Sequence, residues 1–223
     1  MMKQTDAHDV HNPDLLAFMP KDLARVVEIG CSRGALARAY RAANPGAAYV
    51  GIDVDADCVA EAAAHCTSAI HADIETLGDA AFAALFPSDA WVFGDALEHL
   101  KDPWALLRRI RAQLAPTGCI VACIPNVQHW SVQARLVSGQ FRYEDAGLLD
   151  RTHLRWFTRT TILELFASTG YQVVAGGPRI FDEPGREPVL AAIRAMASAL
   201  GADPEIAASD ALPVQYVLRA VPV

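Results

Sequence analysis

Two carboxylates and an imidazole occur within five residues of the chain, at Asp95, Glu98 and His99. A histidine with an ordinary pKa of about 6.5 can take a proton from a hydroxyl group at neutral pH. His99, or Asp95 beside it, could therefore act as the general base of a group-transfer reaction. The same three side chains could instead bind Mg²⁺ or Mn²⁺, or they could be structural, for example a helix-capping pair. The sequence leaves these roles open.

A second candidate base lies further along the chain, where His153 follows Asp150 by three residues. On one helical turn the two side chains would share a face, and Asp150 would orient the imidazole of His153. Alternatively, Asp150 pairs with Arg151 or Arg155, and His153 is a hydrogen-bonded packing residue. The candidate catalytic residues are therefore His99, Asp95 and His153.

These side chains need a scaffold, and the clearest sign of one is a glycine-punctuated turn within residues 25–36. There, an apolar run of strand character ends and passes directly into helix-forming sequence. The first N–H groups of a helix have no partner within it, and glycine lets a ligand approach the backbone closely. A second apolar run, Ala48–Asp53, ends in an acid at about the interval where such folds place a carboxylate on a ribose. The pattern predicts a nucleoside-binding site.

The turn can be aligned with two nucleotide-binding patterns. Gly30-x-Ser32-x-x-Ala35 fits a dinucleotide pattern, whereas a frame that starts at Glu28 and ends at Gly34 begins with an acid. A carboxylate at Glu28 would repel a pyrophosphate but would attract the ammonium group of an amino-acid moiety. The second alignment therefore favours S-adenosylmethionine as the cofactor. A nicotinamide-dependent dehydrogenase is the minor alternative.

At these residues the chain resembles the class I S-adenosylmethionine-dependent methyltransferases, whose first motif reads acid-x-Gly-x-Gly-x-Gly and whose second strand ends in the ribose acid. Ser32 stands where that family has the middle glycine. The resemblance also implies that Asp73 and the backbone of Ile74 contact the adenine, although Asp73 could instead cap the following helix. The expected cofactor contacts are Glu28, Gly30, Cys31, Ser32, Gly34, Asp53, Val54, Asp73, Ile74 and Asp95.

Apolar runs alternate with helical patterns along most of the chain. Seven predicted strands with helical crossovers indicate an α/β fold, a doubly wound, Rossmann-like methyltransferase sheet with helices on both faces. The length favours one domain over residues 1–223, in which residues 201–213 form a connection. The predicted strands are Arg25–Gly30, Ala48–Asp53, Ser68–Ala72, Ala90–Gly94, Cys119–Ile124, Tyr171–Ala175 and Val214–Ala220. The best-marked helices are Ala35–Ala43, Asp55–Cys66 and Pro103–Leu114.

Residues 126–158 are unlike ordinary crossover sequence, because they gather aromatic, arginine and histidine side chains. Aromatic faces stack on sugars and guanidinium groups bind anions, so this insertion is expected to form a lid over the acceptor. The segments Pro125–Trp130 and Asp150–Thr158 resemble methyltransferases of bacterial cell-surface polysaccharide and glycan pathways. The Asp95–His99 cluster resembles an acid-x-x-Glu-His arrangement of the ubiquinone-biosynthesis O-methyltransferases. The arginines available for an anionic sugar are Arg135, Arg142 and Arg155.

Composition restricts the class of protein. The formal net charge of −7 over 223 residues argues against a nucleic-acid partner, because nonspecific nucleic-acid affinity depends on Lys and Arg. No apolar run approaches the roughly 20 residues that span a bilayer, and the polar start Met1–Val10 has no signal-peptide core. Five cysteines without a C-x-x-C motif indicate neither a disulfide framework nor a zinc knuckle. We expect a cytoplasmic protein.

Together, these patterns predict an O-methyltransferase that moves the methyl group of S-adenosylmethionine to a hydroxyl of a sugar or glycan intermediate. The expected partner is that small-molecule or glycan acceptor, and a homodimer is compatible with the sequence. The alternatives are a methyltransferase for a quinone or polyphenol precursor and a non-catalytic, cofactor-binding regulator. A divalent metal such as Mg²⁺ at Asp95, Glu98 and His99 is a further alternative within the enzymatic hypothesis.

Overall fold

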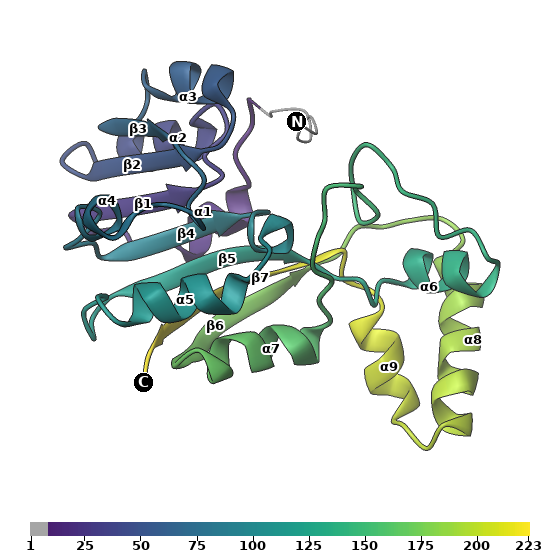
Figure 1. The fold of residues 1–223 in the computed structure, drawn as a ribbon. Helices are drawn as coiled ribbons and strands as arrows, with labels where there is room; N and C mark the ends of the chain where they lie inside the picture. The colour runs from purple at the N-terminus through teal and green to yellow at the C-terminus, as the bar shows by residue number, and fades with distance from the viewer. Residues whose placement is uncertain (1–8) are drawn as a thin grey trace.

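The computed structural model describes residues 9–223, so most of the polar start discussed above, residues 1–8, lies outside the described part. The strands are β1 (Arg25–Ile29), β2 (Ala48–Asp53), β3 (Ser68–His71), β4 (Ala90–Gly94), β5 (Cys119–Pro125), β6 (Tyr171–Arg179) and β7 (Gln215–Pro222). They form one seven-stranded sheet in the order β3-β2-β1-β4-β5-β7-β6 (Figure 1). β7 pairs antiparallel with β5 and β6, and the other neighbours are parallel.

Helices connect these strands. They are α1 (Pro13–Phe18), α2 (Ala35–Ala43), α3 (Ala56–Ala62), α4 (Asp79–Ala83), the 3-10 helix η1 (Leu97–His99), α5 (Pro103–Arg111), α6 (Trp130–Val137), α7 (Arg159–Ser168), α8 (Arg186–Ala199) and α9 (Pro204–Asp210). Capping residues explain several of the starts. Asp102 accepts a hydrogen bond from the backbone N–H of Ala105 at 2.9 Å, and Pro103 occupies the first helical position of α5.

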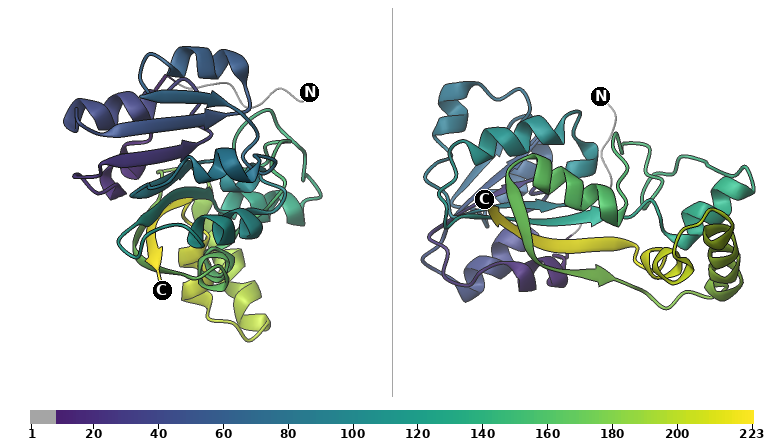
Figure 2. Two further views of the ribbon diagram at one scale, coloured as in Figure 1. Left: turned by 60° about the vertical axis from the view of Figure 1, so that its left-hand side comes forward. Right: turned by 90° about the horizontal axis from the view of Figure 1, so that it is seen from below.

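Helices cover both faces of the sheet, as the sequence predicted. On one face, α4, α5 and α7 bury Phe82, Leu107 and Phe166 in a continuous apolar core. On the other face, α1 and α2 bury Leu15 and Tyr40. Figure 2 shows α5 and α7 on the opposite side of the sheet from α1 and α2. Because burial of apolar area stabilises by roughly 25 cal/mol per Å², these two cores fix the strand ends that carry the site.

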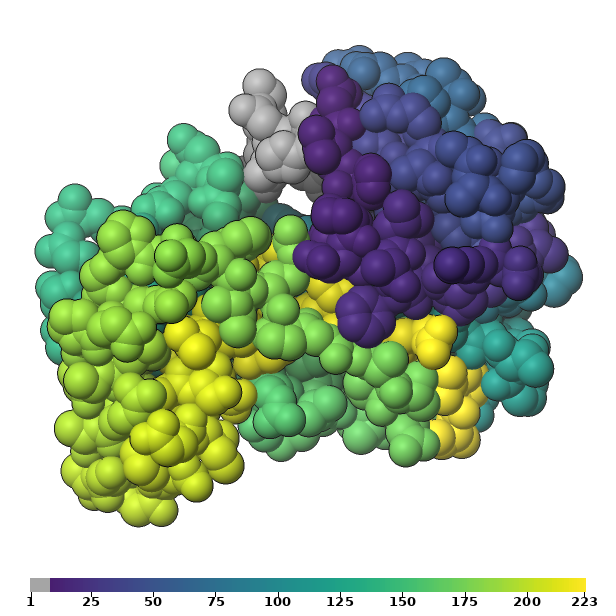
Figure 3. All heavy atoms as spheres, turned by 180° about the vertical axis from the view of Figure 1, so that it is seen from behind, coloured from purple at the N-terminus to yellow at the C-terminus, as the bar shows by residue number. Residues whose placement is uncertain are grey.

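Three helices, α6, α8 and α9, form a lobe of their own. α6, α8 and α9 lie together beyond the ends of the central strands and project from the body of the molecule (Figures 1 and 3). Asn126, which is fully buried, ties β5 to this lobe because its side-chain amide donates to the carbonyls of Asp210 and Pro213, both at 2.8 Å. The apolar core of the lobe consists of Leu190, Ile193, Ala208 and Ala211, with Trp130 packed against it.

Several predicted boundaries were wrong. The strand expected at Tyr171–Ala175 continues to Arg179, because β6 is an edge strand whose alternate side chains are solvated rather than uniformly apolar. Residues 201–213, expected as a connection, contain α9. The helices expected to reach Cys66 and Leu114 end earlier, because their last residues form turns. All five cysteines are free thiols. No helix in the described part of the chain has the length and apolar character to cross a membrane.

Candidate functional site

A cavity of about 920 Å³ opens at the carboxyl ends of β1, β2 and β4. Ligands bind at this edge of an open α/β sheet, because the strand order reverses between β1 and β4 and leaves a crevice. The walls come from the turn after β1, the loops after β2 and β3, η1, and residues 146–153. Apart from Gly34, every candidate site residue expected from the sequence lines this cavity.

The turn after β1 takes its shape from three residues in the left-handed region. Gly30, Ser32 and Gly34 have φ values of 72°, 48° and 78°. The backbone N–H of Ser32 donates to Oδ2 of Asp53 at 2.8 Å, and that of Asp55 donates to Oδ1 at 2.9 Å. The Asp53 carboxylate is therefore held by the backbone of two loops and is placed at the cavity wall, as a ribose-binding acid requires.

Gly34 and Cys31 both serve the packing of the turn after β1. A Cβ on Gly34 would lie 3.1 Å from the Cα of Ala62, so this glycine allows close packing against α3. Gly34 does not line the cavity, and its role as a cofactor contact stays a prediction. The thiol of Cys31 is buried, and burial raises its pKa above the ordinary value. Cys31 lines the cavity as a neutral, unreactive thiol.

Ser32 stores backbone strain at the middle position of the turn. A residue with a side chain pays about 1–2 kcal/mol to adopt the left-handed conformation. Glycine avoids this cost, but its greater freedom in the unfolded chain offsets part of the gain in stability. We expect Ser32→Gly to raise the free energy of unfolding by about 0.5–1 kcal/mol, measured by urea denaturation. Ser32→Ala keeps the Cβ and is the matched control. Equal stability of the glycine and alanine variants would contradict the strain.

Glu28 is a buried acid at the floor of the cavity. Its side chain is 4% exposed, and Oε2 accepts a hydrogen bond from the hydroxyl of Tyr49 at 2.9 Å. Burial raises the pKa of Glu28 from 4.5 to about 8, although the Tyr49 hydrogen bond acts in the opposite direction. Without a cation nearby, the carboxyl is mostly protonated at neutral pH. An ammonium group in the cavity would pull it into the charged form.

This shift makes cofactor affinity depend on pH. Because the bound ammonium requires a carboxylate, the affinity of the protein for S-adenosylhomocysteine should rise between pH 6 and 7.5 by up to about tenfold per pH unit. The stability of the ligand-free protein changes in the opposite direction. The free energy of unfolding falls as the pH rises from 4.5 to about 8, because Glu28 holds its proton more tightly in the folded state than in the unfolded state. Calorimetric titrations at several pH values measure the first effect.

Two variants serve as controls for Glu28. Glu28→Gln removes the titrating group, so its affinity should be lower and independent of pH in this range. Tyr49→Phe removes the hydrogen bond that lowers the pKa of Glu28, so the rise in affinity should move to higher pH. A pH profile of wild-type protein as flat as that of Glu28→Gln would show that the carboxyl does not meet the ammonium.

The adenine-side residues lie where the sequence placed them, on the cavity wall. Oδ1 of Asp73 accepts from the N–H of Glu75 at 2.9 Å, and α4 begins after Gly78, so Asp73 does not cap that helix. Ile74 is buried, and Val54 is 38% exposed on the same wall. These residues put two apolar side chains and an acid on the cavity wall, a combination that would suit a purine with an exocyclic amine.

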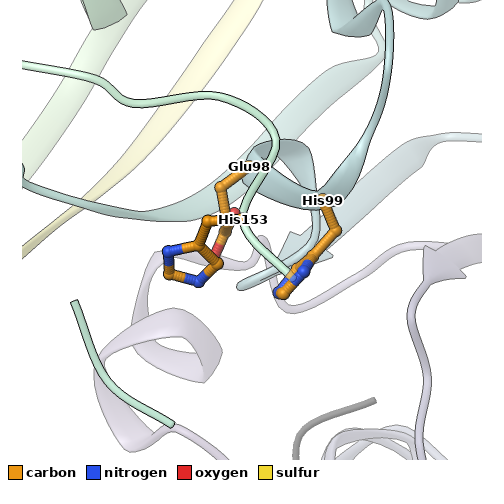
Figure 4. Close-up of side chains that lie close together, drawn as sticks. All are labelled: Glu98, His99 and His153. Carbon is orange, nitrogen blue, oxygen red and sulfur yellow. The ribbon is translucent and has the colours of Figure 1, made fainter. Parts of the chain in front are cut away.

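Three ionisable side chains meet across the cavity from the turn (Figure 4). The rings of His99 and His153 lie edge to face with their centroids 4.8 Å apart, and a ligand atom from each of Glu98, His99 and His153 lies within 4.8 Å of the other two. Burial raises the pKa of Glu98 well above its ordinary value and lowers that of His99. Burial, together with His99, lowers the pKa of His153 to about 4. Burial thus favours the uncharged form of all three groups.

Thr152 sets the tautomer of His99. Its hydroxyl donates to Oδ1 of Asp150 at 2.6 Å, so toward Nδ1 of His99, 3.1 Å away, the hydroxyl oxygen is an acceptor. The Thr152 carbonyl lies 3.2 Å from the same nitrogen and is also an acceptor. These partners assign the proton to Nδ1 and leave a lone pair on Nε2. The predicted helical pairing of Asp150 with His153 is wrong, because the segment is not helical and Asp150 acts through Thr152.

Asp95 belongs to a different hydrogen-bonded group. It directly follows β4 with a φ of 55°, and its Oδ1 accepts from the side-chain amide of Gln215 on β7. Oε1 of Gln215 accepts from Arg179 at 2.5 Å, and Arg179 also donates to Asp14 at 2.8 Å. The set of side chains close enough to hold one ion therefore differs from the predicted Asp95, Glu98 and His99, because His153 takes the place of Asp95.

The arginines of the predicted lid do not reach the cavity. Arg135 pairs with Glu144 at 2.6 Å, and Arg155 donates to the carbonyls of Leu154 and Lys101. None of Arg135, Arg142 and Arg155 lines the cavity, whereas Arg179, which the sequence did not single out, does. Residues 146–153 of the predicted lid form part of the wall, but the preceding helix α6 belongs to the lobe.

His129 and Trp130, two of the aromatic residues expected in the lid, are used for packing. Both contact the carboxylate of Glu183, with Nε2 of His129 at 3.3 Å and Nε1 of Trp130 at 3.0 Å from Oε2. His129 is 2% exposed, and neither residue lines the cavity. They connect the start of α6 to the chain before α8.

The cavity, with Asp53 on its wall and Glu28 at the start of the turn, agrees with a match to a known family. A family model described as a methyltransferase domain matches residues 7–175, which is most of the chain. The chain belongs to this methyltransferase domain family. By family and fold it is a class I methyltransferase domain, and S-adenosylmethionine is the cofactor of these methyltransferases.

Solved methyltransferase structures share the fold. An S-adenosylmethionine-dependent methyltransferase from Mesorhizobium loti superposes with a TM-score of 0.60 at 20% identity, covering 94% of this chain and 96% of that one. Magnesium protoporphyrin IX methyltransferase from Synechocystis, with bound S-adenosylhomocysteine, gives 0.59 at 14% identity, covering 95% and 80%. A mitomycin 7-O-methyltransferase gives 0.57 at 16% identity, covering 94% and 52%. At such identities the likeness establishes the fold.

One curated relative is similar over part of the sequence. Trans-aconitate 2-methyltransferase from Methylobacterium nodulans is 32% identical over 116 residues, which cover 51% of this chain and 43% of that protein. The match therefore spans less than half the length of this relative. The shared part supports the family and leaves the acceptor to be argued from this chain's own residues.

Proposed function

We propose that this domain transfers the sulfonium methyl group of S-adenosylmethionine to a hydroxyl oxygen of a sugar or glycan intermediate. The observation that carries the proposal is the lone pair on Nε2 of His99 at the cavity wall, beside Glu98 and His153. A hydroxyl group must lose its proton as its oxygen attacks the methyl carbon, and this cluster provides the bases that favour the loss.

The remaining demands of the reaction are geometric. The sulfonium is a good leaving group, so the protein has to align oxygen, carbon and sulfur and to exclude competing orientations. Glu28 for the ammonium, Asp53 for the ribose and Asp73 for the adenine would fix the cofactor along the sheet edge. The methyl group would then point toward Asp95 and the cluster at η1.

The sugar or glycan class rests on the resemblance of residues 125–130 and 150–158 to methyltransferases of glycan pathways. In the first segment Pro125 lines the cavity, whereas Asn126, His129 and Trp130 hold the lobe. The second segment lines the cavity through Asp150 and His153, so it carries the remaining support. A quinone or polyphenol acceptor would use the same base.

The cofactor is tested by calorimetric titration with S-adenosylhomocysteine, with NADH as the comparison ligand. Saturable binding of the first and no response to the second is the expected result. A flat trace with S-adenosylhomocysteine, from folded protein free of copurified ligand, would contradict the proposal.

The acceptor is tested by transfer of a labelled methyl group to three classes of compound: nucleotide sugars and glycan intermediates, catechols, and carboxylic acids including trans-aconitate. Transfer to the first class supports the proposal. Transfer confined to catechols would replace the glycan with a phenolic acceptor, and transfer confined to carboxylic acids would remove the need for a base. Tight cofactor binding without transfer to any class would favour a non-catalytic regulator.

A further inference from the structure

Glu98 is a carboxyl group whose surroundings do not satisfy it. The residue is 1% exposed, and within the described part of the chain neither Oε1 nor Oε2 has a hydrogen-bond partner. Burying a polar group without partners costs several kcal/mol, so native structures rarely keep one unless a ligand, an ion or water meets it. Glu98 is one of the residues that line the cavity, from which such a partner can approach.

Two imidazoles share this position. Nδ1–H of His99 donates to the oxygens of Thr152, so Nε2 of that ring keeps a lone pair that can bind a metal ion. Nδ1 of His153 is buried and makes no hydrogen bond in the region that the structure describes. Within residues 9–223, each ring thus presents a nitrogen that no protein group occupies, and an imidazole nitrogen with a free lone pair is a common metal ligand.

We propose that Glu98, His99 and His153 bind one divalent transition-metal ion, of the zinc, manganese or iron(II) class, and that this ion receives the acceptor oxygen. One carboxylate and two imidazoles with open positions toward a cavity are a known catalytic donor set for these ions. Two nitrogen donors favour them over Mg²⁺, which prefers oxygen. This inference rests on the proposed function and refines it. With Nε2 of His99 bound to the ion, the ion would lower the pKa of the bound hydroxyl, and the released proton would pass to water or to Asp95 on the cavity wall.

The spacing of the donors is close to that of a metal site. Metal–ligand bonds of about 2.1 Å separate two ligands by at most about 4 Å, and the three donor atoms here lie within 4.8 Å of one another. A closure of some tenths of an ångström between the donors would complete the site. His153 lies on a segment that is already docked to η1, because the carbonyl of Glu98 accepts from the N–H groups of Leu154 and Arg155 at 2.8 and 2.9 Å.

A neighbouring hydrogen-bond chain supports this role. Metal-binding histidines usually donate their other ring N–H to an oxygen that fixes the ring and increases its basicity. His99 has this arrangement, since Nδ1 meets Thr152, whose hydroxyl donates to the carboxylate of Asp150. The hydrogen bonds from His99 through Thr152 to Asp150 therefore fix the ring of His99 in an orientation that suits a metal ligand.

The test is a metal titration of the untagged, metal-stripped full chain. Co²⁺ is followed by visible absorption, which reports nitrogen and oxygen ligation, and Zn²⁺ is followed by calorimetry. We expect one ion per chain. Glu98→Gln and His153→Gln should each weaken Zn²⁺ binding at least tenfold, while His71→Gln, which alters an exposed histidine outside the cluster, should bind Zn²⁺ as the wild-type protein does.

S-adenosylhomocysteine affinity of each variant provides a separate check of folding. Variants that bind S-adenosylhomocysteine normally but lose Zn²⁺ support the site. Wild-type protein that binds neither Zn²⁺ nor Co²⁺, or cluster variants that bind them with wild-type affinity, would overturn it. Methyl transfer at full rate after metal removal, in the presence of a chelator, would also overturn the role of the ion and leave the proposed function intact. Metal binding without transfer to any acceptor would instead support the site and contradict the proposed function.

Discussion

Asp53→Ala is expected to weaken the binding of S-adenosylhomocysteine by about a hundredfold or more. The carboxylate is 5% exposed and faces the cavity, where it would accept hydrogen bonds from the ribose hydroxyls. Hydrogen bonds to a charged acceptor contribute about 1.5–3 kcal/mol each, and every 1.4 kcal/mol is about tenfold in affinity. Alanine also leaves the N–H groups of Ser32 and Asp55 without their partner, so the turn itself loses support.

The design of the controls separates a lost ligand contact from a general loss of stability. Asp53→Asn keeps one acceptor oxygen and should lose less affinity than alanine. Asp102→Ala removes an aspartate that also accepts a backbone N–H, at the start of α5, but lies outside the cavity. It should cost about 1 kcal/mol of stability and leave the affinity unchanged. An Asp53→Ala protein that binds S-adenosylhomocysteine like wild type would remove Asp53 from the cofactor site.

The cofactor half of the site could be predicted because its determinants are local. The turn after β1 and the acid at the end of β2 are close in sequence, and adjacent parallel strands bring their carboxyl ends to one edge. The backbone at positions 30 and 34 is left-handed, a conformation that favours the glycines found there. Even here, the sequence did not distinguish a glycine that faces the ligand from one that packs against α3.

The acceptor half depends on contacts between distant parts of the chain. Thr152 meets His99 across 53 residues and Gln215 meets Asp95 across 120, and no periodicity or spacing predicts such pairs. The arginines and aromatic residues at 126–158 indicated a lid by composition alone. In the structure that composition is divided, because Trp130 at the start of α6 packs against the core of the lobe while residues of the segment 146–153 line the cavity.

His99→Ala is expected to lower turnover by about 10²–10⁴-fold, the usual contribution of a proton-transfer group. The affinity for S-adenosylhomocysteine should stay within about twofold of wild type, because His99 lies in η1 and its ring contacts Thr152 rather than the turn after β1. His153→Ala should have the same pattern. The rate is measured with the acceptor found by the methyl-transfer screen, and the affinity by calorimetry on the same samples.

Two threonine variants show whether the orientation of His99 matters as well as its presence. Thr152→Ser keeps the hydroxyl that accepts from Nδ1, whereas Thr152→Val keeps the shape and removes the hydroxyl. Valine should lower turnover and allow both ring tautomers, visible in the ¹⁵N shifts of His99, while serine should restore the wild-type values. If His99→Ala instead abolished cofactor binding and left turnover per bound complex unchanged, the imidazole would belong to the cofactor site. The proton of the acceptor would then have to leave through Asp95, the other candidate base at this edge of the sheet.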